Sequence, residues 1–124
     1  MRTWLFIAGI NGALAVVAGA FAAHGLSARL EPRLLSAFTT GAHYHLIHAV
    51  ALGLASLAGQ GAARPRALWA ARLFLAGMVL FSGSLYGLAL TGIRFFAFVT
   101  PIGGLAFIAG WSLLALAALK IEKA

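Results

Sequence analysis

Four long apolar stretches, separated by short loops that hold charged residues or helix breakers, constrain this 124-residue chain more than any other feature. A helix needs roughly 20 apolar residues to cross the hydrocarbon core of a bilayer, where every backbone polar group must find a partner within the protein. We place the four spans at about residues 4–24, 41–59, 67–91 and 98–119. The sequence therefore predicts one all-α domain over residues 1–124, an integral membrane four-helix bundle.

The composition indicates that lipid is part of the solvent. Hydrophobic residues make up 63% of the chain and charged residues only 9%, whereas soluble domains carry about 25% charged residues. The chain has no cysteine, which excludes disulfides, Cys-ligated zinc, iron–sulfur clusters and thiol catalysis. The nine basic residues are scattered rather than gathered in a stripe with aromatic residues, so we exclude nucleic-acid binding and expect membrane lipid as a partner.

The first apolar stretch has two interpretations. Its basic start, apolar run and small residues near the end also describe a secretory signal peptide. The run is long enough to cross the membrane, so we expect a retained first span.

The distribution of Lys and Arg predicts the orientation of the bundle, because cytoplasmic loops carry an excess of these residues. Four spans put both termini on one side. The basic residues on that side are Arg2, Arg64, Arg66, Lys120 and Lys123. Those on the other side are Arg29, Arg33 and Arg94. We therefore expect a multi-pass protein of the inner (plasma) membrane with both termini in the cytoplasm.

A short interfacial helix is expected to lead into the second span. Pro32 suits the first turn of a helix, and Glu31 just before it lies near the positive end of the helix dipole. Nothing else breaks a helix up to Gly59, and these 28 residues would extend about 42 Å at 1.5 Å per residue. That length exceeds the roughly 30 Å hydrocarbon core, and it leaves room for a bend near Thr39–Gly41.

Small residues on the spans predict close helix packing. Lipid tails are as apolar as leucine, so close backbone approach and interhelical hydrogen bonds drive the association of helices. The glycines that we assign to helix packing are Gly12, Gly19, Gly83, Gly87, Gly103, Gly104 and Gly110. They could serve packing within one chain, or form a face that docks on a second copy or on a larger membrane complex.

Polar side chains gather in the half of the bundle away from the termini. The candidate polar or ligand-binding cluster consists of His24, Tyr44, His48, Ser82, Ser84 and Tyr86. At 1.5 Å per residue, His45 and Tyr86 share one level, and Ser82 or Ser84 comes within reach of His48. Asn11 is the main exception to this distribution, because it lies nearer the middle of its span.

Three interpretations of this cluster remain open: a metal or haem site, a structural set of hydrogen-bonded neutral histidines, and a quinone, lipid or proton-linked site. Zinc or haem would need imidazole nitrogens that converge within a few ångströms, but His24 lies nearly two turns above His48. The two acidic residues, Glu31 and Glu122, fall outside the spans. We therefore expect no metal and no cofactor, and favour histidines bonded to Tyr, Ser or backbone carbonyls.

Four segments resemble the YgdD/YwdK-type small inner-membrane proteins, a domain-of-unknown-function family (number 423). They are GAFAAHGL (19–26), LLSAFTTGAHYHLIHAVAL (34–52), FSGSLYGLALTG (81–92) and TPIGGLAFIAGW (100–111). The resemblance covers nearly the whole chain and implies a four-helix inner-membrane protein with no established activity. Its motifs correspond to His24, Tyr44, His48 and residues 82–86. His43 and His45 depart from the family pattern, which weakens any site that needs three histidines.

The leading hypothesis is a non-enzymatic accessory or packing subunit of a larger membrane assembly or homo-oligomer, with His48 bonded to the third span. The alternative is a ligand-binding module for haem, quinone or lipid in the polar half. A membrane enzyme that uses histidine as an acid or base has least support, because no nucleophile–base–acid triad, P-loop or dinucleotide fingerprint is present.

Overall fold

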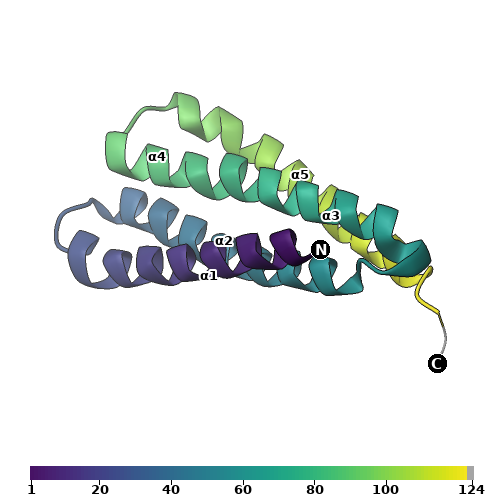
Figure 1. The fold of residues 1–124 in the computed structure, drawn as a ribbon. Helices are drawn as coiled ribbons and strands as arrows, with labels where there is room; N and C mark the ends of the chain where they lie inside the picture. Colours follow the sequence, from purple (N-terminus) through teal and green to yellow (C-terminus); the bar gives the residue numbers. More distant parts are fainter. Residues whose placement is uncertain (123–124) are drawn as a thin grey trace.

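The computed structural model describes residues 1–122 and consists of long helices joined by short turns (Figure 1). The elements in chain order are α1 (Arg2–Phe21), η1 (Ala22–Leu26), α2 (Pro32–Ala58), η2 (Gly61–Ala63), α3 (Arg64–Gly77), η3 (Met78–Ser82), α4 (Gly83–Thr91) and α5 (Phe95–Ala118). Turns η1 and η3 are π-helical, and η2 is a 3₁₀ turn. Because η1, η2 and η3 continue their neighbouring helices, the chain forms four rods. No strand occurs in residues 1–122, and the all-α class is confirmed.

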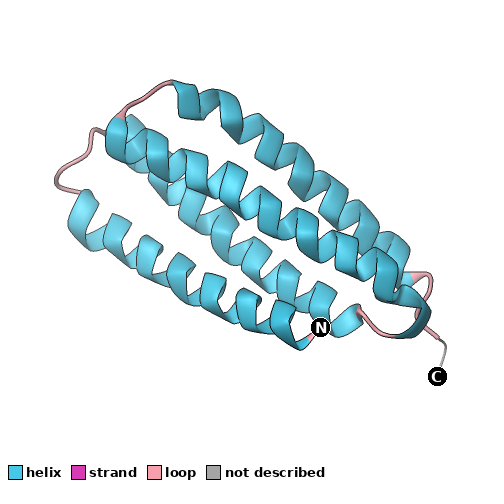
Figure 2. Ribbon diagram, turned by 45° about the horizontal axis from the view of Figure 1, so that its top comes forward, coloured by secondary structure: helices cyan, strands magenta, loops and turns pink. Residues whose placement is uncertain are grey.

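Three of the rods are long and apolar enough to cross a membrane: Arg2–Leu26, Gly61–Thr91 and Phe95–Ala118. The remaining rod, α2, has 27 residues but is less apolar, since three histidines lie in it. It runs along the other rods (Figure 2) and packs against both α1 and α3. The protein is thus a membrane bundle in which α2 is the polar member.

Helix α2 begins at Pro32, as the sequence predicts, and its carboxyl end is capped by Gly59. The expected interfacial helix is the first part of α2 itself, because the helix continues through Thr39–Gly41 without a break. At the end of α4, Gly92 takes the left-handed conformation (φ 71°) and donates its N–H to the carbonyl of Leu88 at 2.7 Å. This glycine turn lets α5 start three residues later.

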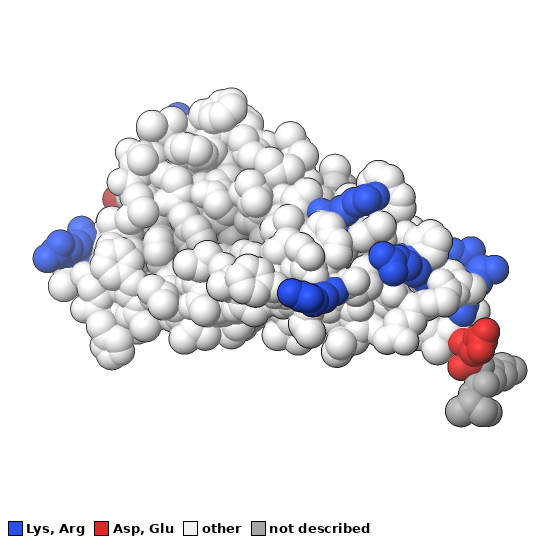
Figure 3. All heavy atoms as spheres, in the orientation of Figure 1, with Lys and Arg blue, Asp and Glu red and all other residues white. Residues whose placement is uncertain are grey.

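The four rods lie in a row rather than in a closed ring. Helix α1 packs on α2, α2 packs on α3 and α4, and these pack on α5; within the described residues, α1 and α5 make no comparable contact. Met1 and the end of α5 lie toward the same end of the bundle (Figure 1). Most Lys and Arg side chains lie toward that end, and a broad uncharged surface separates them from those at the other end (Figure 3). Among residues 1–122, one face of α1 therefore has no helix beside it.

The core is built from small side chains and a few aromatic rings. Its buried members include Ala51, Ala55, Ala70 and Ala71, around the ring of Phe74. Alanines let neighbouring backbones approach closely, which is how membrane helices gain packing energy in the absence of a hydrophobic driving force.

The π turn η3 explains one close approach. A π turn widens a helix locally, and here it places Phe81 against Gly103 of α5, where an added Cβ would lie only 2.3 Å from the Phe81 nitrogen. A Cβ on Gly110 would lie 2.8 Å from the ring of Phe74, and one on Gly87 would meet a phenylalanine ring at 3.0 Å. These three glycines lie at crowded helix contacts.

The other predicted packing glycines have more space. A Cβ on Gly104 or on Gly83 would have its nearest neighbour at 3.9 or 4.0 Å, an ordinary contact distance. Around Gly12 and Gly19 of α1 nothing lies within 4 Å of the added atom. The glycines of α1 therefore do not serve packing among the described residues.

Candidate functional site

His45 lies at the centre of a hydrogen-bonded chain that joins three helices. Its Nε2 lies 2.9 Å from Oδ1 of Asn11 on α1, and its Nδ1 lies 3.0 Å from the hydroxyl of Tyr86 on α4. The amide group of Asn11 in turn donates to the carbonyl of Ile7 at 2.9 Å. The amide oxygen can only accept, so Nε2 of His45 carries the proton and Nδ1 accepts from the Tyr86 hydroxyl. The imidazole in this arrangement is neutral.

This chain pairs both ring nitrogens of a buried histidine. A polar group left unpaired in the apolar part of a membrane protein is costly, so satisfied groups of this kind fix how helices pack. Neither nitrogen of His45 is free to bind a metal, haem iron or ligand without breaking an existing bond. The chain therefore acts as a tie between α1, α2 and α4.

His48 forms a second tie, between α2 and α5. Its Nδ1 lies 2.7 Å from the carbonyl oxygen of Tyr44, and the indole N–H of Trp111 donates to its Nε2 at 3.0 Å. A carbonyl accepts only, so the proton is on Nδ1 and the ring is again neutral. The imidazole stacks on Phe107 with ring centres 3.5 Å apart. Both nitrogens and one ring face are thus occupied.

The prediction that His48 is bonded to the third span is wrong, because its partner is on α5. The two serines have other environments. Ser84 donates to the carbonyl of Phe81 at 2.8 Å and shares a hydrogen bond with Thr100 of α5. The hydroxyl of Ser82 is fully buried and has no hydrogen-bond partner among residues 1–122. Ser84 therefore joins α4 to α5, and Ser82 does not reach His48.

The two remaining candidates lie at the surface. His24 lies in η1 and is exposed. Tyr44 is 40% exposed, and its ring contacts Phe81, with ring centres 4.8 Å apart. The six candidate residues therefore form no single site. Tyr86 belongs to the tie through His45, and His48 belongs to the tie with Trp111, with Tyr44 beside it. Ser84 bonds to Thr100, Ser82 has no hydrogen-bond partner among residues 1–122, and His24 is exposed.

The arrangement of these side chains is unsuited to binding a metal ion. Within the part of the chain that the structure describes, no three His, Cys, Asp or Glu side chains come together in a way that could hold one. The nitrogens of His45 and His48 are already used, and His43 is exposed. The geometry serves helix packing better than ligation.

Four residues of these ties were not among the candidates: Asn11, His45, Thr100 and Trp111. The sequence gives a signal for three of them. Asn11 is the exceptional polar residue near the middle of a span, Thr100 is a polar residue in the half of the bundle away from the termini, and the residue count places His45 at the level of Tyr86. That shared level is confirmed by the hydrogen bond between them. Trp111 gave no such signal, since an indole ring counts as apolar although its N–H is a donor.

A groove on the lipid-facing surface runs beside the second tie. It has a volume of about 480 Å³ and is lined by Tyr44, His48, Phe81, Phe107 and Trp111, among others. Its walls are mostly aromatic, and His48 presents only a ring whose nitrogens are already bonded.

Comparison with known proteins shows which family the chain belongs to. The family model described as "Protein of unknown function (DUF423)" matches residues 18–104. The membrane protein YwdK of Bacillus subtilis is 41% identical over 121 residues, which cover 97% of this chain and 98% of that relative. The inner membrane protein YgdD of Escherichia coli K12 is 42% identical over 123 residues, covering 98% of this chain and 93% of the relative.

A third relative, the membrane protein SSP2132 of Staphylococcus saprophyticus, is 40% identical over 124 residues, and the alignment covers 98% of this chain and all of that relative. No solved structure matches the chain. These relatives carry the UPF0382 membrane-protein name. The family match covers most of the chain, and the relatives align over nearly all of it, so the protein belongs to the DUF423 family of membrane proteins of unknown function.

Proposed function

We propose that this protein is a non-enzymatic accessory subunit that docks through α1 onto a helix of another membrane protein or of a second copy. One observation carries the proposal. On each of α2, α3, α4 and α5 at least one glycine is crowded by another helix, since an added Cβ would lie within 3.1 Å of a neighbouring atom at Gly41, Gly77, Gly87, Gly103 and Gly110. By contrast, an added Cβ on Gly9, Gly12 or Gly19 of α1 would have no atom of another described element within 4 Å. Glycines on membrane helices let a second helix approach closely, and here the second helix is outside the described chain.

The polar ties support this proposal because they leave α1 firmly attached. Helix α1 has one extensive neighbour, α2, yet Asn11 holds it through His45 to Tyr86 of α4. A helix that is fixed on one side and open on the other presents a rigid face. We also propose that both termini lie in the cytoplasm, in line with the excess of Lys and Arg on their side.

The test uses Gly12→Leu, which places a bulky side chain on the open face. Within residues 1–122, an added Cβ on Gly12 would have no atom of another element within 4 Å, so we expect the fold to survive and the assembly to dissociate. A matched control is Ala115→Leu on the exposed surface of α5. The measurement is the mass of the particle in mild detergent, by multi-angle light scattering, together with crosslinking in native membranes.

Ala13, also exposed on α1, provides the crosslinking site. The chain has no cysteine, so Ala13→Cys gives a single thiol. Oxidation to a product of twice the chain mass identifies a second copy, and a heavier product identifies a different partner. A particle that is monomeric in mild detergent and yields no crosslinked product in native membranes would contradict the proposal.

A second candidate function is a binding module for a quinone or a lipid, favoured by the aromatic groove beside Tyr44. Aromatic walls suit a flat ring, but haem fits poorly because both nitrogens of His48 are bonded. If this candidate holds, an organic extract of purified protein contains a quinone in near-equal molar amount, and Phe107→Ala lowers that amount. An extract without a stoichiometric small molecule rejects it.

A further inference from the structure

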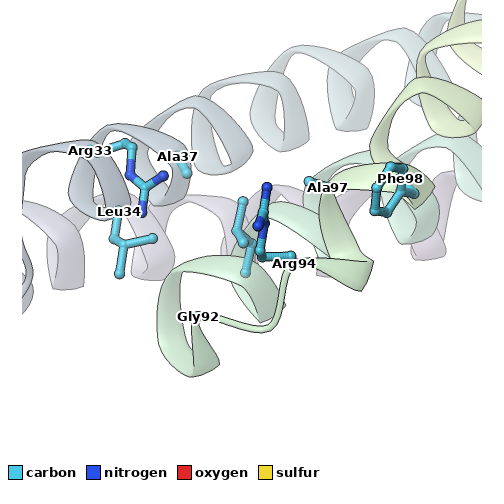
Figure 4. A pocket seen from close by; sticks show the side chains of 8 residues that line it. Arg33, Leu34, Ala37, Gly92, Arg94, Ala97 and Phe98 are labelled. Atoms are coloured by element: carbon cyan, nitrogen blue, oxygen red, sulfur yellow. The ribbon is translucent and has the colours of Figure 1, made fainter.

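The end of the bundle opposite the termini carries a hollow that the proposed function does not use. It lies between the start of α2 and the loop from α4 to α5, and has a volume of about 660 Å³. Arg33 and Arg94, from these two segments, lie on opposite sides of it (Figure 4). Side chains of Leu34, Leu88 and Phe98 make the rest of its lining largely apolar. The hollow thus combines two cations with a hydrocarbon surface.

The charge around the hollow is positive. Arg29, Arg33 and Arg94 are the basic residues at this end and Glu31 is the acidic one, which gives 3 − 1 = +2. Arg33 uses its Nε to bond Glu31 at 3.1 Å, and both side chains are largely exposed. That bond leaves the terminal nitrogens of Arg33 available to a further anion, since a guanidinium has five N–H donors.

The helices add to this field. Both α2 and α5 start beside the hollow, at Pro32 and Phe95, and neither has a side chain that caps its first N–H groups. The amino end of a helix carries a partial positive charge that favours anions. Two helix starts without a side-chain cap and two arginines from different segments therefore lie beside the same space.

We propose that this hollow binds the phosphate of an anionic phospholipid, with part of an acyl chain along Leu34, Leu88 and Phe98. A free phosphate would use the arginines but not the apolar lining. A lipid uses both, and lipid headgroups lie at the ends of membrane-spanning helices, where Arg side chains attract anionic lipids. The occupant is therefore a lipid rather than a soluble anion.

The experiment measures lipid retained by purified protein in native mass spectrometry. Full-length protein in neutral detergent is titrated with phosphatidylglycerol or with phosphatidylcholine of the same chain length. We expect one phosphatidylglycerol per chain, bound more tightly than phosphatidylcholine. Arg33→Gln and Arg94→Gln each weaken this binding about fivefold, the effect of one arginine near anionic lipid.

Arg29→Gln is the matched control, because it removes the same charge at the same end from a residue that does not line the hollow. It leaves the affinity unchanged if the hollow is the site. An equal loss with Arg29→Gln, or equal affinity for the two lipids, overturns the proposal. Circular dichroism of each variant checks that helix content is retained, as expected for exposed side chains.

Two further arms separate the sources of phosphate. Ala37→Phe fills part of the hollow, and we expect it to reduce phosphatidylglycerol binding while Arg33 and Arg94 remain in place. Millimolar inorganic phosphate leaves the bound lipid in place if the acyl chain contributes. Complete displacement by phosphate, together with normal lipid binding in Ala37→Phe, shows a soluble anion site and overturns the proposal.

Discussion

Replacing Gly103 with alanine is expected to produce a large loss of stability. The added Cβ would lie 2.3 Å from the backbone nitrogen of Phe81 and 2.7 Å from its Cα. These are backbone atoms, which cannot rotate away as a side chain can, so α5 must move away from η3. Overpacking of this kind costs about 1–3 kcal/mol or more, and we expect the upper part of that range.

Gly104→Ala is the matched control, one residue along the same helix. Its Cβ would meet the ring of Phe81 at 3.9 Å, so the change should stay within about 0.5 kcal/mol. The measurement is the midpoint of unfolding in mixed micelles with increasing sodium dodecyl sulfate, followed by circular dichroism. Equal midpoints for the two variants would show that Phe81 and Gly103 are not packed as described.

His45→Leu is expected to have the second large effect, because it removes the centre of the tie between α1, α2 and α4. The hydroxyl of Tyr86 and the amide oxygen of Asn11 both lose a partner. An orphaned buried polar group costs about 1–3 kcal/mol, whereas single hydrogen bonds in membrane proteins average only about 0.6 kcal/mol. For two such groups we expect a loss of about 2–3 kcal/mol in the free energy of unfolding.

His43→Leu tests whether this loss belongs to the tie. His43 lies two residues earlier on α2 and is exposed, so its replacement should leave the unfolding midpoint unchanged. A double-mutant cycle with Tyr86→Phe adds a second check, since residues in one network are not additive. If the effects of His45→Leu and Tyr86→Phe simply sum, the two side chains do not act together.

The helices of this fold follow from the sequence because the membrane leaves few alternatives. Every backbone group in lipid must be bonded within a helix, so the length of each apolar stretch and the breakers between them locate the rods. Pro32 and Gly92 set helix ends where the sequence places them. The sequence does not predict that α2 continues without a bend through Thr39–Gly41, because neither threonine nor glycine forces or forbids a bend there.

The partners of the histidines were harder to predict. Counting residues gives the depth of a side chain, and that was enough to relate His45 to Tyr86. It does not give the direction in which the side chain points or the tilt of its neighbour. His48 was therefore assigned to the serines of the third span, whereas its partner is Trp111 of α5. The family pattern likewise favours His48 over His45, whereas in the structure each ring has both nitrogens bonded.

The polar character of α2 has a consequence for how the protein enters the membrane during synthesis. This rod leaves the ribosome second, but its composition does not place it among the three rods that are apolar enough to cross a membrane. Its histidines bond to Asn11 on the rod before it, to Tyr86 on the rod after it, and to Trp111 on the last rod. The Nε2 of His48 can therefore accept its hydrogen bond from Trp111 only after α5 has been made. Until α3 and α4 are made, Asn11 of α1 is the partner available to α2, and insertion of the two rods as a hairpin is the route that this distribution of partners favours.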